Sequence, residues 1–329
     1  MKSKVLILII LLVPLLYVCV CNRKSRIENS SSVLPESLSA FNLFEGDMSL
    51  LKPAKGVQLY ELSSVLFTDY AEKQRLTKLP PGKKVRITGD GLPVFPEGTI
   101  LAKTFFYSRS KDSNRVGRQI IETRILQLTK GKWIAGTYRW NRTHKDAHFT
   151  ADEVEVPVNF MTNKGNFRQI KYKIPSTNDC ISCHQSGEDI IPIGPKAMNL
   201  NKPILAHSGL VNQLEDFERK GLFKLDKDIS SILKLPDYSD NSIPLEQRSR
   251  AYLEINCAHC HNPTGWASQK SILLNYAAPL QMTNISVRRN DILGRMKTSG
   301  QFHMPKLGTT IIDNEGLAMI EKYLSSLPK

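Results

Sequence analysis

Residues 180–184 read Cys-Ile-Ser-Cys-His, and residues 257–261 read Cys-Ala-His-Cys-His. Cys-x-x-Cys-His is the pattern at which a c-type haem is attached. In such a site both cysteines form thioethers with haem vinyl groups, and the histidine binds the iron. The first pentad (180–184) and the second pentad (257–261) therefore predict two covalently bound haem c groups. The expected attachment residues are Cys180, Cys183, Cys257 and Cys260, and the expected iron ligands are His184 and His261.

The cysteine count favours this prediction over a disulfide-bonded fold. The chain has six cysteines, of which four lie in the pentads and two in the N-terminal apolar segment. The alternatives are a zinc site made from both Cys-x-x-Cys pairs, or a redox dithiol. Paired cysteines of zinc sites usually lie about 15–20 residues apart, much closer than these two pairs. Zinc also does not require a histidine directly after each pair.

Residues 1–21 are expected to form a targeting segment. Two lysines precede an apolar run, Val5 to Val20, that is short for a membrane-spanning helix and suits a signal peptide. The end of this run resembles a bacterial lipoprotein processing site, with Cys19 or Cys21 as the lipidated residue. A cleaved signal peptide and an uncleaved anchor are the alternatives. We therefore expect a periplasmic or cell-envelope protein held at the membrane surface by its N-terminal anchor.

The charge of the chain bears on its partners. Residues 22–45, rich in Ser and Asn at their start, are expected to be a flexible linker. The formal net charge is +14, and the basic residues are spread along the chain rather than gathered in one block. This distribution argues against nucleic-acid binding. A basic surface can steer acidic redox partner proteins or lie near anionic lipid head groups.

The segment 46–178 has the pattern of antiparallel strands. Val154, Val156 and Val158 alternate with other residues at spacing two, and residues 163–165 (Asn-Lys-Gly) mark a turn. Similar β-branched and aromatic runs precede them. We therefore expect a β-rich domain here, in the form of an antiparallel sheet or a small barrel.

The pattern becomes helical after this segment. Leu214 and Phe217 belong to one helical stripe within residues 179–240, the expected first haem-binding segment. Residues 246–255 predict a helix that leads into the second pentad, and Asn314 is a candidate cap for the last helix.

A helix, a pentad, a Met-Pro and a closing helix together resemble a small class I cytochrome c. The resemblance covers residues 246–329 and implies an all-α domain over 241–329. It also implies that Met304, which precedes Pro305, is the sixth ligand of the second haem iron. Such a thioether ligand favours the reduced iron. The alternative ligands are Met296, Met282 and His303. The expected fold class is therefore α+β, with an N-terminal antiparallel β-rich domain followed by an all-α class I cytochrome c-like domain.

The sequence indicates less about the residues around the first haem than about those around the second. Gly194-Pro195 resembles the Gly-Pro whose proline carbonyl accepts a hydrogen bond from the proximal histidine of cytochrome c, and this resemblance gives that role to Pro195. The sixth ligand of the first haem iron is one of five candidate residues, unless this iron is five-coordinate and has no sixth ligand. The five candidates are Met198, His207, His148, His144 and Met161.

Several phrases extend the resemblance over most of residues 40–329. They are residues 66–71, 95–99, 192–196, 250–256 and 304–308. With them the chain resembles a family of bacterial two-haem c-type cytochromes of unestablished activity. The β-rich half is also similar to the β-form cytochromes c-prime and their lysine-crosslinked relatives, in which a five-coordinate haem binds small gases or oxidises hydroxylamine. That similarity implies that Lys103, or an aromatic residue such as Phe105, faces the first iron.

Two classes of function follow from these expectations. The first is an exported dihaem c-type cytochrome that transfers electrons. The second is a haem redox enzyme or gas-binding protein, with an open first haem and the second haem as an electron relay. Electron transfer is favoured because no pair of acid and base residues marks a catalytic pocket; Glu122 and Asp146 occupy ordinary polar positions. A third reading makes the β-rich domain a docking module for a membrane or a partner complex.

Overall fold

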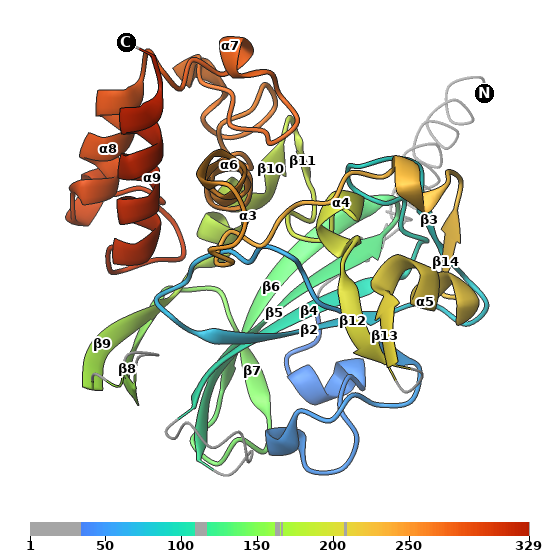
Figure 1. Ribbon diagram of the computed structural model, residues 1–329. Coiled ribbons are helices and arrows are strands. Elements are labelled where there is room, and N and C mark those ends of the chain that lie inside the picture. Colours follow the sequence, from blue (N-terminus) through green and yellow to red (C-terminus); the bar gives the residue numbers. More distant parts are fainter. Residues whose placement is uncertain (1–33, 109–116, 162–164, 166, 207–208, 329) are drawn as a thin grey trace, which may run out of the picture. The chain divides into compact units, whose positions relative to one another are not determined.

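The computed structural model describes residues 34–108, 117–161, 165, 167–206 and 209–328 (Figure 1). The chain divides into two units, residues 1–34 and 35–329, and the second unit holds almost all described residues. The expected signal segment, Cys19, Cys21 and His207 lie outside the described residues. Among the helices that are described, none is both long and apolar enough to cross a membrane.

A six-stranded antiparallel sheet is the centre of the described unit. Its strand order is β1-β2-β4-β5-β6-β7. The strands are β1 (Val57–Leu59), β2 (Glu72–Lys78), β4 (Ile100–Ser108), β5 (Arg118–Thr129), β6 (Lys132–Trp140) and β7 (Ala147–Thr150). Lys130 and Gly131, with φ of 52° and 73°, form the two-residue turn between β5 and β6. Positive φ at both positions gives a turn whose twist matches that of the two strands.

Smaller sheets surround this central sheet. The hairpin of β8 (Val154–Met161) and β9 (Phe167–Ile174) is amphipathic, and Val158 and Ile170 pack with Phe105 and Tyr107 of β4. Strand β3 (Val85–Ile87) pairs in parallel with β14 (Phe223–Leu225). The remaining hairpins are β10 (Gln185–Ser186) with β11 (Asp189–Ile190) and β12 (Pro203–Ala206) with β13 (Gly209–Asn212).

The described residues contain seven α-helices, most of them short. They are α3 (Thr177–His184), α4 (Ala197–Leu200), α5 (Gln213–Arg219), α6 (Leu245–Asn256), α7 (Leu280–Thr283), α8 (Arg289–Lys297) and α9 (Asn314–Ser326). The 3-10 turns are η1 (Leu38–Phe41), η2 (Met48–Leu50), η3 (Ile229–Ser231), η4 (Ser268–Lys270) and η5 (Gly300–Phe302). The last helix was expected to be capped by Asn314, but α9 already begins at Asn314 and its cap is Asp313, whose side chain accepts from the backbone N–H of Gly316.

The expected fold class is wrong. The described chain is β-rich, and no all-α class I cytochrome c-like domain is evident in it. Residues 35–329 form one compact unit, and long, largely irregular segments separate α6 from α7 and α8 from α9. Hydrogen bonds to side chains, rather than helices, hold much of this irregular backbone. The buried guanidinium of Arg250, for example, donates to the carbonyls of Asn275, Tyr276 and Ala278. The resemblance to class I cytochrome c, from which the all-α domain was expected, could not reveal such bonds and overestimated the helical content.

The region of residues 179–240 is also less helical than expected. This region contains five short strands, β10 to β14, together with the end of α3 and the helices α4 and α5. Glycines with positive φ explain part of this difference, because Gly187 (φ 62°) and Gly209 (φ 100°) allow the chain to reverse between short strands.

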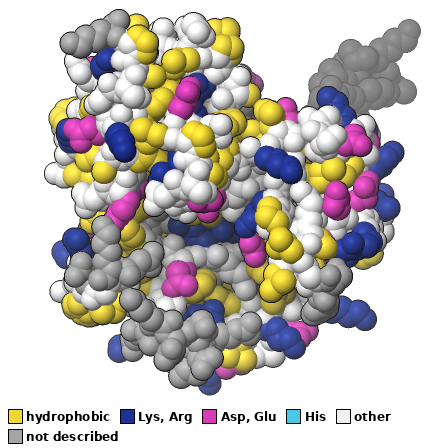
Figure 2. Space-filling view, viewed as in Figure 1, with side chains coloured by type: hydrophobic (Ala, Val, Ile, Leu, Met, Phe, Trp, Pro, Cys, Tyr) yellow, Lys and Arg dark blue, Asp and Glu magenta, His cyan; other side chains and the backbone are white. Residues whose placement is uncertain are grey.

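Basic side chains are spread over the face of the molecule shown in Figure 2, and some of them lie in a hollow near its middle. The scattered surface charges agree with the spread of Lys and Arg along the sequence. The hollow was not expected from the sequence.

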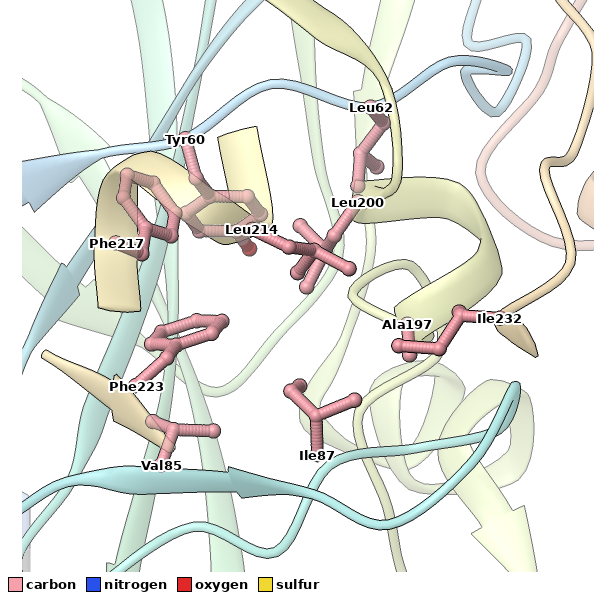
Figure 3. Packing of buried hydrophobic residues seen from close by; sticks show 10 residues of the cluster. All are labelled: Tyr60, Leu62, Val85, Ile87, Ala197, Leu200, Leu214, Phe217, Phe223 and Ile232. Atoms are coloured by element: carbon pink, nitrogen blue, oxygen red, sulfur yellow. The ribbon is translucent and has the colours of Figure 1, made fainter. Parts of the chain in front are cut away.

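One of the hydrophobic clusters fixes the segment that follows the first pentad (Figure 3). Phe217 of α5 and Phe223 of β14 contact each other edge to face, with ring centroids 4.9 Å apart. Val85 and Ile87 of β3 and Leu214 of α5 complete this part of the cluster. The cluster joins residues 85–87 to residues 197–225, and thereby ties the chain after the first pentad to the β-rich part.

Candidate functional site

The first pentad lies on the last turns of helix α3. Ser176 and Asp179 form a capping box at its start, with both reciprocal hydrogen bonds present. The helix places Cys180 and Cys183, three residues apart, near one face. Cys180 is buried against the sheet, with its Sγ 3.6 Å from Oγ1 of Thr137 in β6. The central sheet therefore positions this pentad.

His184 has the hydrogen bonding expected of an iron ligand. Its Nδ1 lies 2.7 Å from the carbonyl oxygen of Ile191. Since a carbonyl only accepts, Nδ1 carries the proton and Nε2 keeps a free lone pair. Burial lowers the pKa of His184 to about 3, against the opposing effect of the Ile191 carbonyl, so the ring is neutral at pH 7. A proton-accepting partner of this kind fixes the orientation of a metal-binding ring.

The structure gives this supporting role to Ile191 and not to Pro195. The β10–β11 hairpin returns the chain directly to His184, and the N–H of Ile191 also donates to the His184 carbonyl at 2.9 Å. The resemblance that pointed to Pro195 presumed a longer path after the pentad. Strands of two residues leave almost no pattern in a sequence, and Gly187 was the main available sign of this turn.

The second pentad follows helix α6 in a tight turn. Cys257 is the C-cap of the helix, and its carbonyl accepts from the N–H groups of Cys260 at 3.1 Å and His261 at 3.0 Å. The side-chain amide of Asn262 donates to the carbonyls of Ala258 and His259. These bonds fix the backbone that carries both thiols and the histidine.

Gly265 allows the next loop to pass very close to this turn. A Cβ at position 265 would lie 2.5 Å from the carbonyl oxygen of Cys260, 2.7 Å from that of His259 and 2.8 Å from Nδ2 of Asn262. Gly265→Ala is therefore expected to destabilise the protein by about 1–3 kcal/mol, because backbone atoms must move to admit the methyl group. Thermal unfolding followed by circular dichroism measures this effect. Gly294→Ala is the control: its Cβ meets nothing within 4 Å, and alanine favours helix α8. Equal stability of the two variants would contradict the assigned role of Gly265.

A cavity of about 700 Å³ lies against the second pentad. Cys257, Cys260 and His261 line it, and Met304 reaches the same cavity from a distant part of the sequence. Most of its remaining apolar lining comes from Trp266, Ala267, Ile272, Leu274, Ile292, Met296, Pro305 and Leu307. The cavity thus has a largely apolar wall with two thiols, an imidazole and a thioether, the side chains expected around the second haem.

The imidazole and the two thiols of the second pentad are left without bonds to the rest of the described chain in two respects. Nδ1 of His261 is buried and has no hydrogen-bond partner within the described part of the chain. Such orphaned groups are rare in folded proteins and call for an explanation. The thiols of Cys257 and Cys260, like those of Cys180 and Cys183, form no disulfide. The free thiols and the adjacent imidazole fit a covalently attached haem. The unpaired Nδ1 shows in addition that, among the described residues, the His261 ring lacks a supporting carbonyl of the kind that Ile191 provides for His184.

The three alternative ligands, His303, Met282 and Met296, differ in whether they line the cavity and in whether their ligand atoms are already hydrogen-bonded. His303 uses both ring nitrogens, with Nδ1 3.0 Å from the Thr298 carbonyl and Nε2 2.9 Å from the Thr309 hydroxyl. Met282 is 66% exposed and does not line the cavity. Met296 is buried and does line it, and so it is the one competitor of these three that shares the cavity with His261.

The two pentads lie next to each other. A second cavity, of about 250 Å³, is lined by Cys183 and His184 on one side and by Ala258 and His259 on the other. The loops after the pentads are also joined: the N–H of Gly187 donates to the Thr264 carbonyl at 2.7 Å, and the hydroxyls of Ser186 and Thr264 are 2.9 Å apart. Nothing in the sequence predicted this contact.

The five candidates for the sixth ligand of the first haem are not brought to His184. Met198 packs in a hydrophobic cluster with Leu235, Ala251 and Ile255. Met161 is 42% exposed, His148 lies 3.4 Å from the Ser37 hydroxyl, and His144 contacts the Trp140 ring. None of these four lines the cavity beside His184, and His207 lies outside the described residues. Lys103 is closer, since its charge lowers the pKa of Cys183 against the larger effect of burial.

Over the described ranges, no group of three or more His, Cys, Asp or Glu side chains is arranged to hold a metal ion. No known protein family, curated protein or solved structure matches the chain significantly. The function must therefore be argued from the two pentads and their surroundings.

Proposed function

We propose that the chain is an exported c-type cytochrome with two covalently bound haems that carries electrons. The main support is the arrangement of the second pentad, where Cys257, Cys260, His261 and Met304 line one largely apolar cavity. Met304 lies far from the pentad in the sequence and yet lines the same cavity, which supports its proposed role as a ligand. A haem bound at such a site supplies a one-electron redox centre whose potential follows its axial ligands and surroundings.

The chain's own residues have distinct tasks in this proposal. Cys180 and Cys183 hold the first haem, and His184 offers Nε2 to its iron while the Ile191 carbonyl fixes the ring. His261 and Met304 approach the second iron from different segments of the chain. The apolar side chains that line the 700 Å³ cavity would reduce the contact of the second haem with water and so tune its potential.

The contact between the pentads supports electron transfer in particular. The 250 Å³ cavity and the hydrogen bonds of Thr264 hold the two attachment segments side by side. Two redox centres attached there exchange electrons within one molecule, without an intermediate protein. The N-terminal segment, with Cys19 or Cys21 lipidated, would hold this pair at the membrane surface in the periplasm or cell envelope. The net charge of +14 would attract acidic redox partners.

A redox enzyme or gas-binding protein is the second candidate function. It is favoured by one observation: the described residues bring none of the expected sixth ligands to the first pentad. Basic residues of the central sheet lie near that pentad instead. A free coordination position beside basic side chains suits a small ligand.

A redox titration followed by absorbance, with and without carbon monoxide, separates the two functions. We expect two reversible one-electron transitions whose midpoints stay unchanged under carbon monoxide. Carbon monoxide binds ferrous iron with an open position, and it then raises the midpoint by roughly 59 mV for each tenfold excess over its dissociation constant. Such a rise at the haem of the first pentad in the wild-type protein would contradict pure electron transfer. Met304→Ala, which opens the second iron, is the positive control.

A further inference from the structure

Basic residues form a row across one face of the central sheet. Arg75 of β2 is paired with Lys103 of β4, and Lys103 is paired with Arg124 of β5. Directly paired residues of neighbouring antiparallel strands point to the same face. Lys73, two residues before Arg75, shares this face because side chains alternate along a strand. We call Lys73, Arg75, Lys103 and Arg124 the cationic row.

The cationic row is withdrawn from solvent. Arg75 is only 8% exposed, the side chain of Arg124 is 17% exposed, and Lys73 and Lys103 are half-buried. The rings and stems around them are apolar: Lys103 Nζ lies 5.0 Å and the Arg124 guanidinium 4.4 Å from the centre of the Phe105 ring. Charges in such surroundings are costly unless they have partners of opposite charge.

The carboxylates of the protein do not balance these charges. Glu122, fully buried, binds Arg124 through both oxygens and also accepts from the Tyr172 hydroxyl at 2.6 Å. The negative charge of Asp69 raises the pKa of Lys73, but the Asp69 oxygens accept hydrogen bonds from the backbone N–H and the hydroxyl of Thr310.

Three members of the row thus lack a directly bound partner of opposite charge in the described part of the chain, although Glu61 acts on Arg75 and Glu122 acts on Lys103 at longer range. Among the side chains that the structure describes, no hydrogen bond or ion pair reaches Lys73, Arg75 or Lys103. Burial, and then repulsion by Arg124 and Arg75, lowers the pKa of Lys103 to about 7, and the pKa of Lys73 is lowered for similar reasons. An anion bound beside these side chains would offset their mutual repulsion and favour the charged form of both lysines.

The cationic row lies beside the first pentad. Thr137 of β6 is the direct neighbour of Arg124 in the sheet, and its hydroxyl is 3.6 Å from Sγ of Cys180. Burial raises the pKa of the Cys183 thiol, and the positive charges of Lys103 and Arg124 lower it.

We propose that the cationic row is a binding site for a carboxylate or another small oxyanion next to the first attachment site. Two sources offer this chemistry. One is a free anion, the substrate class expected if the first haem is open. The other is the pair of propionates of the first haem, and this source alone rests on the proposed function.

The test uses the loaded full-length protein with acetate as the probe, at constant ionic strength. For a free anion we expect saturable acetate binding by calorimetry, weakened at least tenfold in Arg75→Met and in Lys103→Met. Methionine keeps much of the apolar stem and relieves repulsion, so both variants should fold. Arg75→Lys and Lys103→Arg keep the charge and should keep most of the binding. Lys171→Met, at an 80% exposed position, is the control and should bind like the wild type.

If the propionates occupy the row, acetate does not bind to the loaded protein. The carboxylate bands in the infrared difference spectrum between reduced and oxidised protein should then shift in Arg75→Met and Lys103→Met, but not in Lys171→Met. Absence of both acetate binding and a band shift would overturn the proposal. A chain that carried no haem would refute the proposed function instead, while acetate binding through Arg75 and Lys103 could still be measured on it.

Discussion

Replacement of Met304 by alanine is expected to lower the reduction potential of the second haem by on the order of 0.1 V, a fraction of the ~0.8 V over which axial ligands vary haem potentials. The reason is that a thioether stabilises ferrous iron more than ferric iron, and water or an empty position does not. Met304 lines the same cavity as His261, and the far-red ferric absorption band that marks a Met–iron bond should disappear with it.

Two further methionines provide the controls for this experiment. Met282 is 66% exposed and outside the cavity, so Met282→Ala should leave both the band and the potential unchanged. Met296 is buried in the cavity wall, so Met296→Ala should disturb packing while the band persists. Loss of the band in Met296→Ala and its survival in Met304→Ala would show that the ligand is Met296.

Local features of the fold could be predicted from the sequence. Val154, Val156 and Val158 predicted a strand from their spacing, and β8 contains all three. The helix before the second pentad was expected over 246–255 and covers Leu245–Asn256. In each of these segments the pattern repeats over several residues, so burial of one face decides the local conformation.

Features that depend on contacts between distant segments could not be predicted. Ile191 supports His184 through a hairpin with two residues in each strand, which is too short for any periodicity. The expected all-α domain failed because loops held by side-chain hydrogen bonds, such as those of Arg250, fill much of that region.

The cationic row shows the same limitation. Arg75, Lys103 and Arg124 meet only through the register of three strands. Of the three, only Lys103 was singled out from the sequence, through the similarity to the β-form cytochromes c-prime, and nothing linked it to the two arginines. The contact of the two pentads through Thr264 likewise depends on how the loops after them fold. Register and loop contacts are set by the whole core, so single-sequence patterns leave them open.

Mass spectrometry of the protein from a host that attaches c-type haem tests the central claim most directly. We expect the mass of two haems in addition to the processed chain, retained after extraction with acidified acetone, because four thiols without disulfides provide both thioethers at each pentad. Replacing both Cys180 and Cys183 by alanine should remove one haem completely, and replacing both Cys257 and Cys260 should remove the other. Circular dichroism of the two double variants controls for folding. A wild-type protein without covalently bound haem, or with a mass unchanged by either pair of substitutions, would contradict the account.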